Sequence, residues 1–191
     1  MQKLNSITNT LAGRAAMVGG AAFAAGGVTQ IVHSQRGSGN SVVGVAGYLT
    51  LSFFVVALIA IAPTFIALAR ESKARAASRA AIAAAAGTTV LGITSITSLV
   101  AGHDLGLFNV VAPVTNAAWL LGSIVLAVAL KREAAVPTAV AVGLPLAWVA
   151  SIPLATVGGG VISGAYFLFV GYLLANDAVK RTSVAVGTAH A

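Results

Sequence analysis

The chain has 191 residues, of which 58% are hydrophobic and only 8% are charged. A soluble domain carries about 25% charged residues, so this composition excludes a soluble globular fold and predicts that lipid surrounds much of the protein. Six membrane-spanning helices need roughly 120 residues, which leaves room only for short loops and tails. The chain has no cysteine, which excludes disulfides and thiolate metal sites.

Six apolar runs follow one another along the chain. Their length, and the lack of a two-residue alternation, predict helices rather than the strands of a membrane barrel. We expect an all-α, polytopic transmembrane bundle of six helices, in one domain over residues 1–191 with a disordered tail at 182–191. Small residues at Ala22 and Ala24 also fit a signal-peptide cleavage site, which leaves a five-span form as the alternative. The expected spans are residues 12–32, 42–69, 80–101, 109–130, 136–157 and 161–175.

The net charge of +7 is concentrated at the ends of the apolar runs. Basic loops of membrane proteins stay in the cytoplasm. Placing both termini there leaves only Arg36 outside, so the charge predicts a cell-membrane protein with cytoplasmic termini rather than a nucleic-acid-binding protein. Frequent Ala, Gly, Val and Arg indicate a GC-rich bacterial genome. The basic residues on the cytoplasmic side are Lys3, Arg14, Arg70, Lys73, Arg75, Arg79, Lys131, Arg132, Lys180 and Arg181.

Small residues recur at helical spacing on several runs. Helices in lipid associate through close backbone contacts at such stripes, so we expect packing within one bundle, with homo-oligomerisation through one stripe as the alternative. In the fifth run, Pro145 and Pro153 predict kinks. The stripes are Gly160, Gly164 and Gly171 on the sixth run and Ala16, Gly20 and Ala24 on the first.

Polar side chains gather at one depth of the expected bundle. Residues 55–63 and 80–87 of the inner half contain none, whereas every span brings polar or aromatic groups to the outer half, Thr50 and Ser151 among them. These groups either bond carbonyls of their own helices and mark the interface, or converge on a cavity for a membrane lipid or lipophilic small molecule. The candidate ligand-binding residues are Gln30, Tyr48, Ser95, Ser98, Asn109, Asn116, Trp119, Trp148 and Tyr166.

Three ionisable residues on the outer side, His33, His103 and Asp104, are the candidates for catalysis. Histidine titrates near neutral pH and acts as an acid or a base. The same residues lack the spacing and the fourth ligand of a zinc site, and no phosphate-binding glycine loop is present, so we expect neither a metal nor a cofactor. No span carries a charge near its middle, which disfavours ion-coupled transport.

The first run has a Gly- and Ala-rich body and ends in the segment GVTQIVH, with Gln30 and His33 three residues apart. This pattern resembles the first helix of small, uncharacterised multi-pass membrane proteins of actinobacteria, although Ser34 stands where that pattern has a proline. The resemblance covers the first third of the chain. It implies a bacterial membrane protein and no particular activity.

Three functions remain open at this point. The prediction is a non-catalytic protein whose outer-half cavity binds a lipophilic ligand or docks a membrane partner, because a complete catalytic set and deep charges are both missing. The first alternative is a membrane-embedded enzyme, such as a cyclase, isomerase or hydrolase, acting on a lipophilic substrate. The second is a small facilitator or exporter that uses a kinked fifth span and a hinge at residues 158–160.

Overall fold

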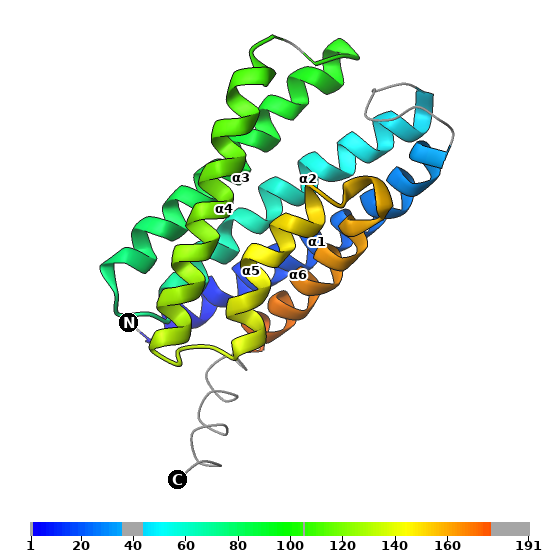
Figure 1. Ribbon diagram of the computed structural model, residues 1–191. Helices are drawn as coiled ribbons and strands as arrows, with labels where there is room; N and C mark the ends of the chain where they lie inside the picture. The colour runs from blue at the N-terminus through cyan, green and yellow to red at the C-terminus, as the bar shows by residue number, and fades with distance from the viewer. Residues whose placement is uncertain (1, 36–43, 105, 177–191) are drawn as a thin grey trace.

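The computed structural model describes residues 2–35, 44–104 and 106–176, and all regular structure in these ranges is helical (Figure 1). This confirms the all-α bundle of six helices. Arg36, Lys180, Arg181 and the tail predicted at 182–191 lie outside the described residues. In chain order the elements are α1 (Gln2–Gln35), α2 (Gly44–Ala69), α3 (Arg75–Ala101), α4 (Phe108–Arg132), α5 (Thr138–Ser151), the 3-10 turn η1 (Ala155–Val157) and α6 (Gly159–Ala175).

Helices α1, α2, α3 and α4 are each long and apolar enough to cross a membrane, whereas α5 and α6 are apolar but shorter. With a rise of about 1.5 Å per residue, α5 extends about 21 Å, less than the hydrocarbon core of about 30 Å. These lengths and compositions are those of an integral membrane protein. Of two helices that pack side by side, α5 with 14 residues is much shorter than α4 with 25.

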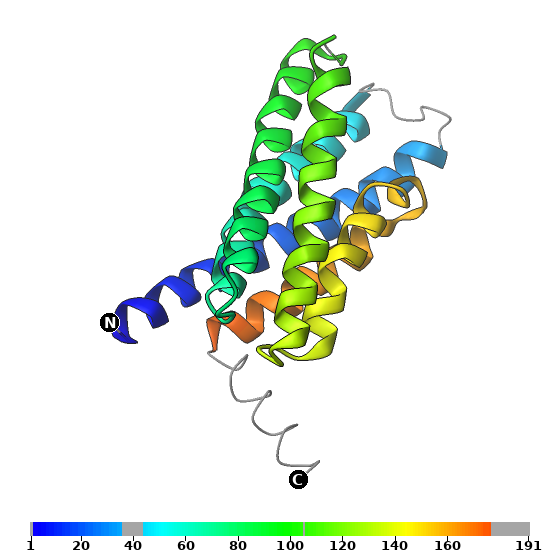
Figure 2. The same ribbon diagram turned by 60° about the vertical axis from the view of Figure 1, so that its left-hand side comes forward.

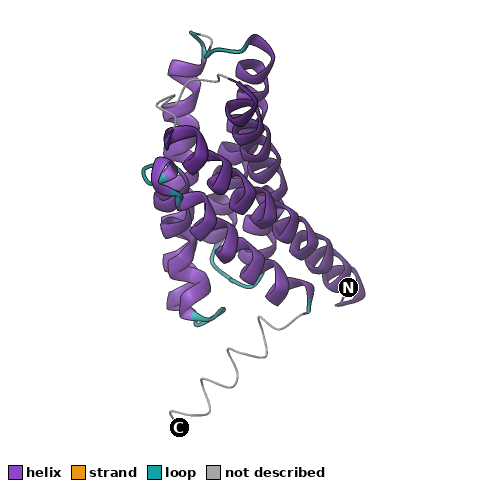
Figure 3. Cartoon of the chain, turned by 90° about the vertical axis from the view of Figure 1, so that its right-hand side faces the viewer, coloured by secondary structure: helices purple, strands orange, loops and turns teal. Residues whose placement is uncertain are grey.

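Consecutive helices pack side by side, and contact between α1 and α6 closes the ring (Figures 1 and 2). The described connections alternate between two ends of the bundle, as Figure 3 shows. The end at which α1 begins and α6 ends also holds the turns at 70–74 and 133–137, and we call it the basic end because Arg70, Lys73 and Lys131 are exposed there. The opposite end, with the turns at 102–107 and 152–158, is called the distal end.

Glycines allow α1 and α6 to pack backbone against backbone in antiparallel directions. A β-carbon added at Gly164 would lie 2.6 Å from both the Ala24 nitrogen and the Gly20 oxygen, and one added at Gly171 would lie 2.6 Å from the Gly13 oxygen. Real β-carbons do not approach backbone atoms so closely, so these positions require glycine. The stripes predicted on the first and sixth runs therefore pack against each other within the chain.

The helix α5 ends at Ser151, short of the predicted end at 157. Proline disfavours helical backbone at the residue before it and lacks the N–H that the next turn would need, so Pro153 lies beyond the helix instead of kinking it. Gly158, with φ of +89°, turns the chain back and precedes α6. Only Pro145 remains inside α5, where the nearby Val140 carbonyl accepts a hydrogen bond from the Tyr166 hydroxyl at 2.7 Å.

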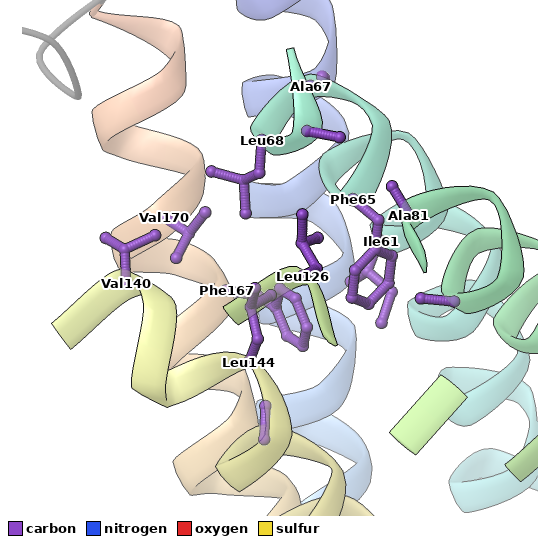
Figure 4. Close-up of a cluster of buried hydrophobic side chains, with 14 of the residues drawn as sticks. Ile61, Phe65, Ala67, Leu68, Ala81, Leu126, Val140, Leu144, Phe167 and Val170 are labelled. Atoms are coloured by element: carbon purple, nitrogen blue, oxygen red, sulfur yellow. The ribbon is translucent and has the colours of Figure 1, made fainter. Parts of the chain in front are cut away.

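The half of the bundle at the basic end is filled mainly by apolar side chains, with Thr64 and Ser123 buried among them. Phe65 from α2, Leu126 from α4, Leu144 from α5 and Phe167 from α6 are completely buried, and Figure 4 shows them together with further side chains of the same cluster. This packing places large apolar side chains between the basic end and the bundle centre. The prediction of an apolar inner half agrees with this core.

A hydrogen bond joins the two turns at the basic end. The Glu133 carboxylate accepts the Lys73 N–H at 2.8 Å, and this bond, with a further one from the Ser72 side chain, lowers the pKa of Glu133. The ionised Glu133 carboxylate therefore stabilises the folded state. This contribution is complete above the ordinary glutamate pKa, about 4.3, and is lost as the pH falls through the lowered pKa of Glu133.

We expect Glu133→Ala to make the Lys73 amide exchange with deuterium several-fold faster at pH 6, because its acceptor is removed. The difference from the wild type should vanish once the pH is below the lowered pKa of Glu133. Arg132→Gln, an exposed neighbour on the same turn, should leave the exchange unchanged. Equal rates in the wild type and Glu133→Ala at pH 6 would show that this bond does not hold the turn.

Candidate ligand cavity

A cavity of about 320 Å³ lies in the distal half of the bundle. All helices except α3 contribute to it, together with the turn before α4 and η1. The bundle therefore surrounds a space at the depth where the sequence places its polar residues. The lining residues are Phe23, Gly26, Gly27, Gln30, His33, Gly47, Thr50, Leu51, Phe54, Asp104, Phe108, Ser151, Ile152, Ala155 and Gly160.

Polar groups lie along the distal part of this cavity. Gln30 and His33 come from the last turns of α1, and Asp104 comes from the turn between α3 and α4. His33 is only 3% exposed, so its imidazole lies within the protein although it borders the cavity. A bound molecule would find there an amide, an imidazole and a carboxylate, which together offer both hydrogen-bond donors and acceptors.

Two hydroxyl groups of the lining are already tied to neighbouring helices. Thr50 of α2 donates to the Thr29 hydroxyl of α1 at 2.9 Å. The Ser151 and Ser163 hydroxyls lie 2.8 Å apart, and both are within hydrogen-bond distance of the Ala147 carbonyl, at 2.7 and 2.9 Å. These bonds fix the positions of α2 and α6 around the cavity.

Aromatic rings form the floor of the cavity. Phe23 and Phe54 both line it, and their rings meet edge to face with centroids 6.1 Å apart. Below the cavity Phe23 also stacks on Trp119 at 6.5 Å and on Phe167 at 6.0 Å. Phe167 contacts Phe65 in turn, so the floor continues into the apolar core of the basic half.

The cavity exists because its walls carry few large side chains. Gly27 and Gly160 touch across α1 and α6, with a β-carbon at Gly27 reaching within 2.6 Å of the Val161 nitrogen. The chain leaves α5 for η1, which packs against the end of α1 through a hydrogen bond of 3.2 Å from the Ser34 hydroxyl to the Thr156 carbonyl. In the part of the chain that the structure describes, no helix therefore fills the space above Ser151 beside α4.

Several of the candidate residues lie outside the cavity lining and serve the packing of helices. Trp148 of α5 donates to the Asn116 side chain of α4 at 3.1 Å, Tyr166 bonds the Val140 carbonyl as described above, and Ser95 donates to the Leu91 carbonyl of its own helix at 2.8 Å. The bond of Ser95 is of the kind that the first interpretation describes, within one helix, whereas Trp148, Asn116 and Tyr166 form bonds between helices that neither interpretation predicted.

The remaining candidates occupy varied environments. Trp119 and Ser98 are buried, and neither the indole N–H of Trp119 nor the Ser98 hydroxyl has a hydrogen-bond partner among the described residues. Tyr48 and Asn109 are exposed near the distal end, where the Tyr48 hydroxyl lies close to Gly102 at the end of α3. None of these four lines the cavity.

The catalytic candidates are divided by the structure. His33 and Asp104 both border the cavity, whereas His103 is exposed on the turn next to Asp104 and does not. Over the described ranges, no group of three His, Cys, Asp or Glu side chains is placed to hold a metal ion. Of the described residues, one imidazole and one carboxylate border the cavity, those of His33 and Asp104.

Sequence reasoning missed the apolar half of this site. Phe23, Phe54 and Ile152 have no feature that distinguishes a cavity wall from an ordinary core position in an apolar chain. Thr50 and Ser151 do stand out, because they share the depth of Gln30 and His33, and a strict sorting by depth would have included them. Comparison of the chain with protein-family models, curated proteins and solved structures finds no match.

Proposed function

We propose that the chain is a multi-pass protein of a bacterial cell membrane that binds a lipophilic molecule in the distal cavity, with both termini in the cytoplasm. One observation supports this most directly: the cavity has polar groups at its distal part, namely Gln30, His33 and Asp104, and a floor of Phe23 and Phe54. Ligand sites combine a mostly apolar wall with a few polar groups in this way. Exposed Arg and Lys at the basic end support the orientation.

The dimensions of the cavity restrict the ligand. Ligand pockets have volumes of roughly 300 to 1,000 Å³, and about 320 Å³ is at the lower end of that range. One ring system or part of one hydrocarbon chain fits this volume, while a whole two-chain lipid does not. The preferred ligand has a polar group for Gln30 and an apolar body that packs on the aromatic floor.

The test is to look for a molecule retained by the purified protein. We expect native mass spectrometry in mild detergent to show a bound lipophile on the wild type. Gln30→Leu should weaken the binding about tenfold and lower the bound fraction, because a lost hydrogen bond of about 1.4 kcal/mol corresponds to a tenfold change in Kd. Gln35→Leu, an exposed glutamine on the same helix outside the cavity, is the matched control. A protein that retains nothing, or Gln30→Leu behaving as the wild type, would contradict the proposal.

A membrane-embedded enzyme is the second candidate, because His33 and Asp104 border the same cavity. An acid and a base beside a bound lipophile could isomerise or hydrolyse it. The same spectra distinguish the two functions, since an enzyme would convert the added ligand to a species of different mass or retention, and His33→Gln would stop the conversion. A facilitator is less well supported, because Phe65, Leu126 and Phe167 fill the route toward the basic end.

A further inference from the structure

The two helices on one side of the cavity differ greatly in length. α4 has 25 residues and α5 has 14. They are joined by the hydrogen bond between Trp148 and Asn116, which lies one turn before the end of α5 and two turns after the start of α4. Beyond this bond α5 continues for only one turn, whereas α4 continues for two, so the distal end of α4 extends past the end of α5, as Figures 1 and 2 show.

Helical periodicity identifies the face of α4 that borders this gap. Asn109 and Asn116 lie seven residues apart, which places them on the same face of the helix. Asn116 is the residue bonded to α5, so Asn109 marks the same face two turns higher, where α5 has ended. Asn109 is exposed, in agreement with a missing neighbour at that height.

The cavity lies behind this gap. Phe108 at the start of α4 lines it from one side, and Ile152 and Ala155 line it from the other. The chain between Ile152 and Gly158 turns toward α1 instead of α4, as the contact between Ser34 and Thr156 shows. Among the described residues, no helix continues α5 beside the distal end of α4, on the side that would face lipid in a membrane.

The polarity of the cavity follows that of the surrounding lipid layer. Phe23 lies two turns, about 10 Å, below Gln30 on α1, and Phe54 lies one turn below Thr50 on α2. Gln30 and Thr50 are therefore nearer the membrane surface and Phe23 and Phe54 nearer its centre, while Phe108 lines the cavity close to Asp104 at the distal end. A lipid of the outer leaflet has the same order, with its headgroup outward and its chains inward.

We propose that the gap between Asn109 on α4 and Ile152 after α5 is a lateral portal, through which one hydrocarbon chain of an outer-leaflet lipid enters the cavity. This inference rests on the proposed function and names its ligand class and route. The lipid keeps its orientation: its polar part meets Gln30, His33 and Asp104, one chain rests on Phe23 and Phe54, and the remainder stays in the bilayer. The volume of about 320 Å³ is sufficient for one hydrocarbon chain or part of it.

The test uses the full chain in liposomes that contain phosphatidylglycerol with a diazirine in the middle of one acyl chain. After irradiation, mass spectrometry locates the lipid adducts. We expect adducts on Phe23 and Phe54 in the wild type, at least fivefold fewer in Asn109→Trp, and more in Ile152→Ala, which widens the gap from the other side. Val110→Trp, the same substitution on an exposed neighbouring residue of another face, should match the wild type.

Retention of the co-purified lipophile in detergent, where the protein is open from all sides, separates the two proposals. If Asn109→Trp retains it as the wild type does but forms fewer adducts in liposomes, the portal is supported. If a lipophile is retained but Phe23 and Phe54 carry no adducts, or Asn109→Trp labels as fast as the wild type, the portal is overturned and the cavity function stands. If the wild type neither retains a lipophile nor forms adducts, both fail.

Discussion

Replacing Gly164 by leucine should strongly destabilise the folded protein. The added β-carbon would lie 2.6 Å from the Ala24 nitrogen and from the Gly20 oxygen, so α6 would have to move away from α1 over its whole length. Overpacking costs about 1 to 3 kcal/mol where side chains can adjust, and here only backbone can move. We expect a loss of more than about 3 kcal/mol, against a total stability of about 5 to 15 kcal/mol.

Unfolding by sodium dodecyl sulfate, followed by circular dichroism and by the folded peak in size exclusion, measures this loss. Ala165→Leu is the matched control, because Ala165 is the next residue of α6 and is exposed. It should unfold as the wild type does. If Gly164→Leu were as stable as Ala165→Leu, α1 and α6 would not pack backbone against backbone at Gly164. The placement of Gln30 at the cavity, which depends on this packing, would then also be contradicted.

Phe23→Ala is expected to weaken the fold and to deepen the cavity. Phe23 is 3% exposed and contacts the rings of Phe54, Trp119 and Phe167. Each aromatic pair contributes about 0.5 to 1.5 kcal/mol. In a soluble protein, the free energy of transferring the side chain out of water adds to the cost of such a substitution. In lipid this contribution is largely absent. We therefore expect a loss of about 2 to 3 kcal/mol in the free energy of unfolding.

Phe23→Ala should also increase the size of the ligand that the cavity retains. A purely structural role for Phe23 would not predict such a gain. Removing the ring joins new space to the cavity, so Phe23→Ala should retain a bulkier lipophile than the wild type in native mass spectra. Phe169→Ala removes a ring of the same helix bundle that is 46% exposed, and should alter neither stability nor retention by much. An unchanged unfolding midpoint for Phe23→Ala would contradict the stacked floor.

The helices were predictable because apolar runs of sufficient length between charged or glycine-rich segments have few other stable structures in lipid. The end of α5 was not, since the effect of Pro153 depends on whether neighbours satisfy the carbonyls it leaves free. A proline within a membrane helix can kink it, as predicted, or end it. Here the residues around Gly158 complete a turn, and the helix ends at Ser151.

Part of the cavity was predictable in the same way. Gln30, His33 and Asp104 share a depth, and polar groups at one depth tend to meet inside a bundle. The roles of Asn116, Trp148 and Tyr166 depend on the rotation of each helix about its axis, which hydropathy does not determine. Those three side chains turn toward neighbouring helices and bond them, whereas the aromatic floor carries no polar signal at all.

The most direct test of the central claim, a lipophile held in a cavity closed toward the basic end, is a crystal structure of the protein grown from a lipidic mesophase. We expect elongated density in the cavity, with one end near Gln30 and His33 and the other on Phe23 and Phe54. The layer of Phe65 and Phe167 should be closed beneath it. A collapsed cavity with α4 packed on η1, or a water-filled path through that layer to the basic end, would contradict the account.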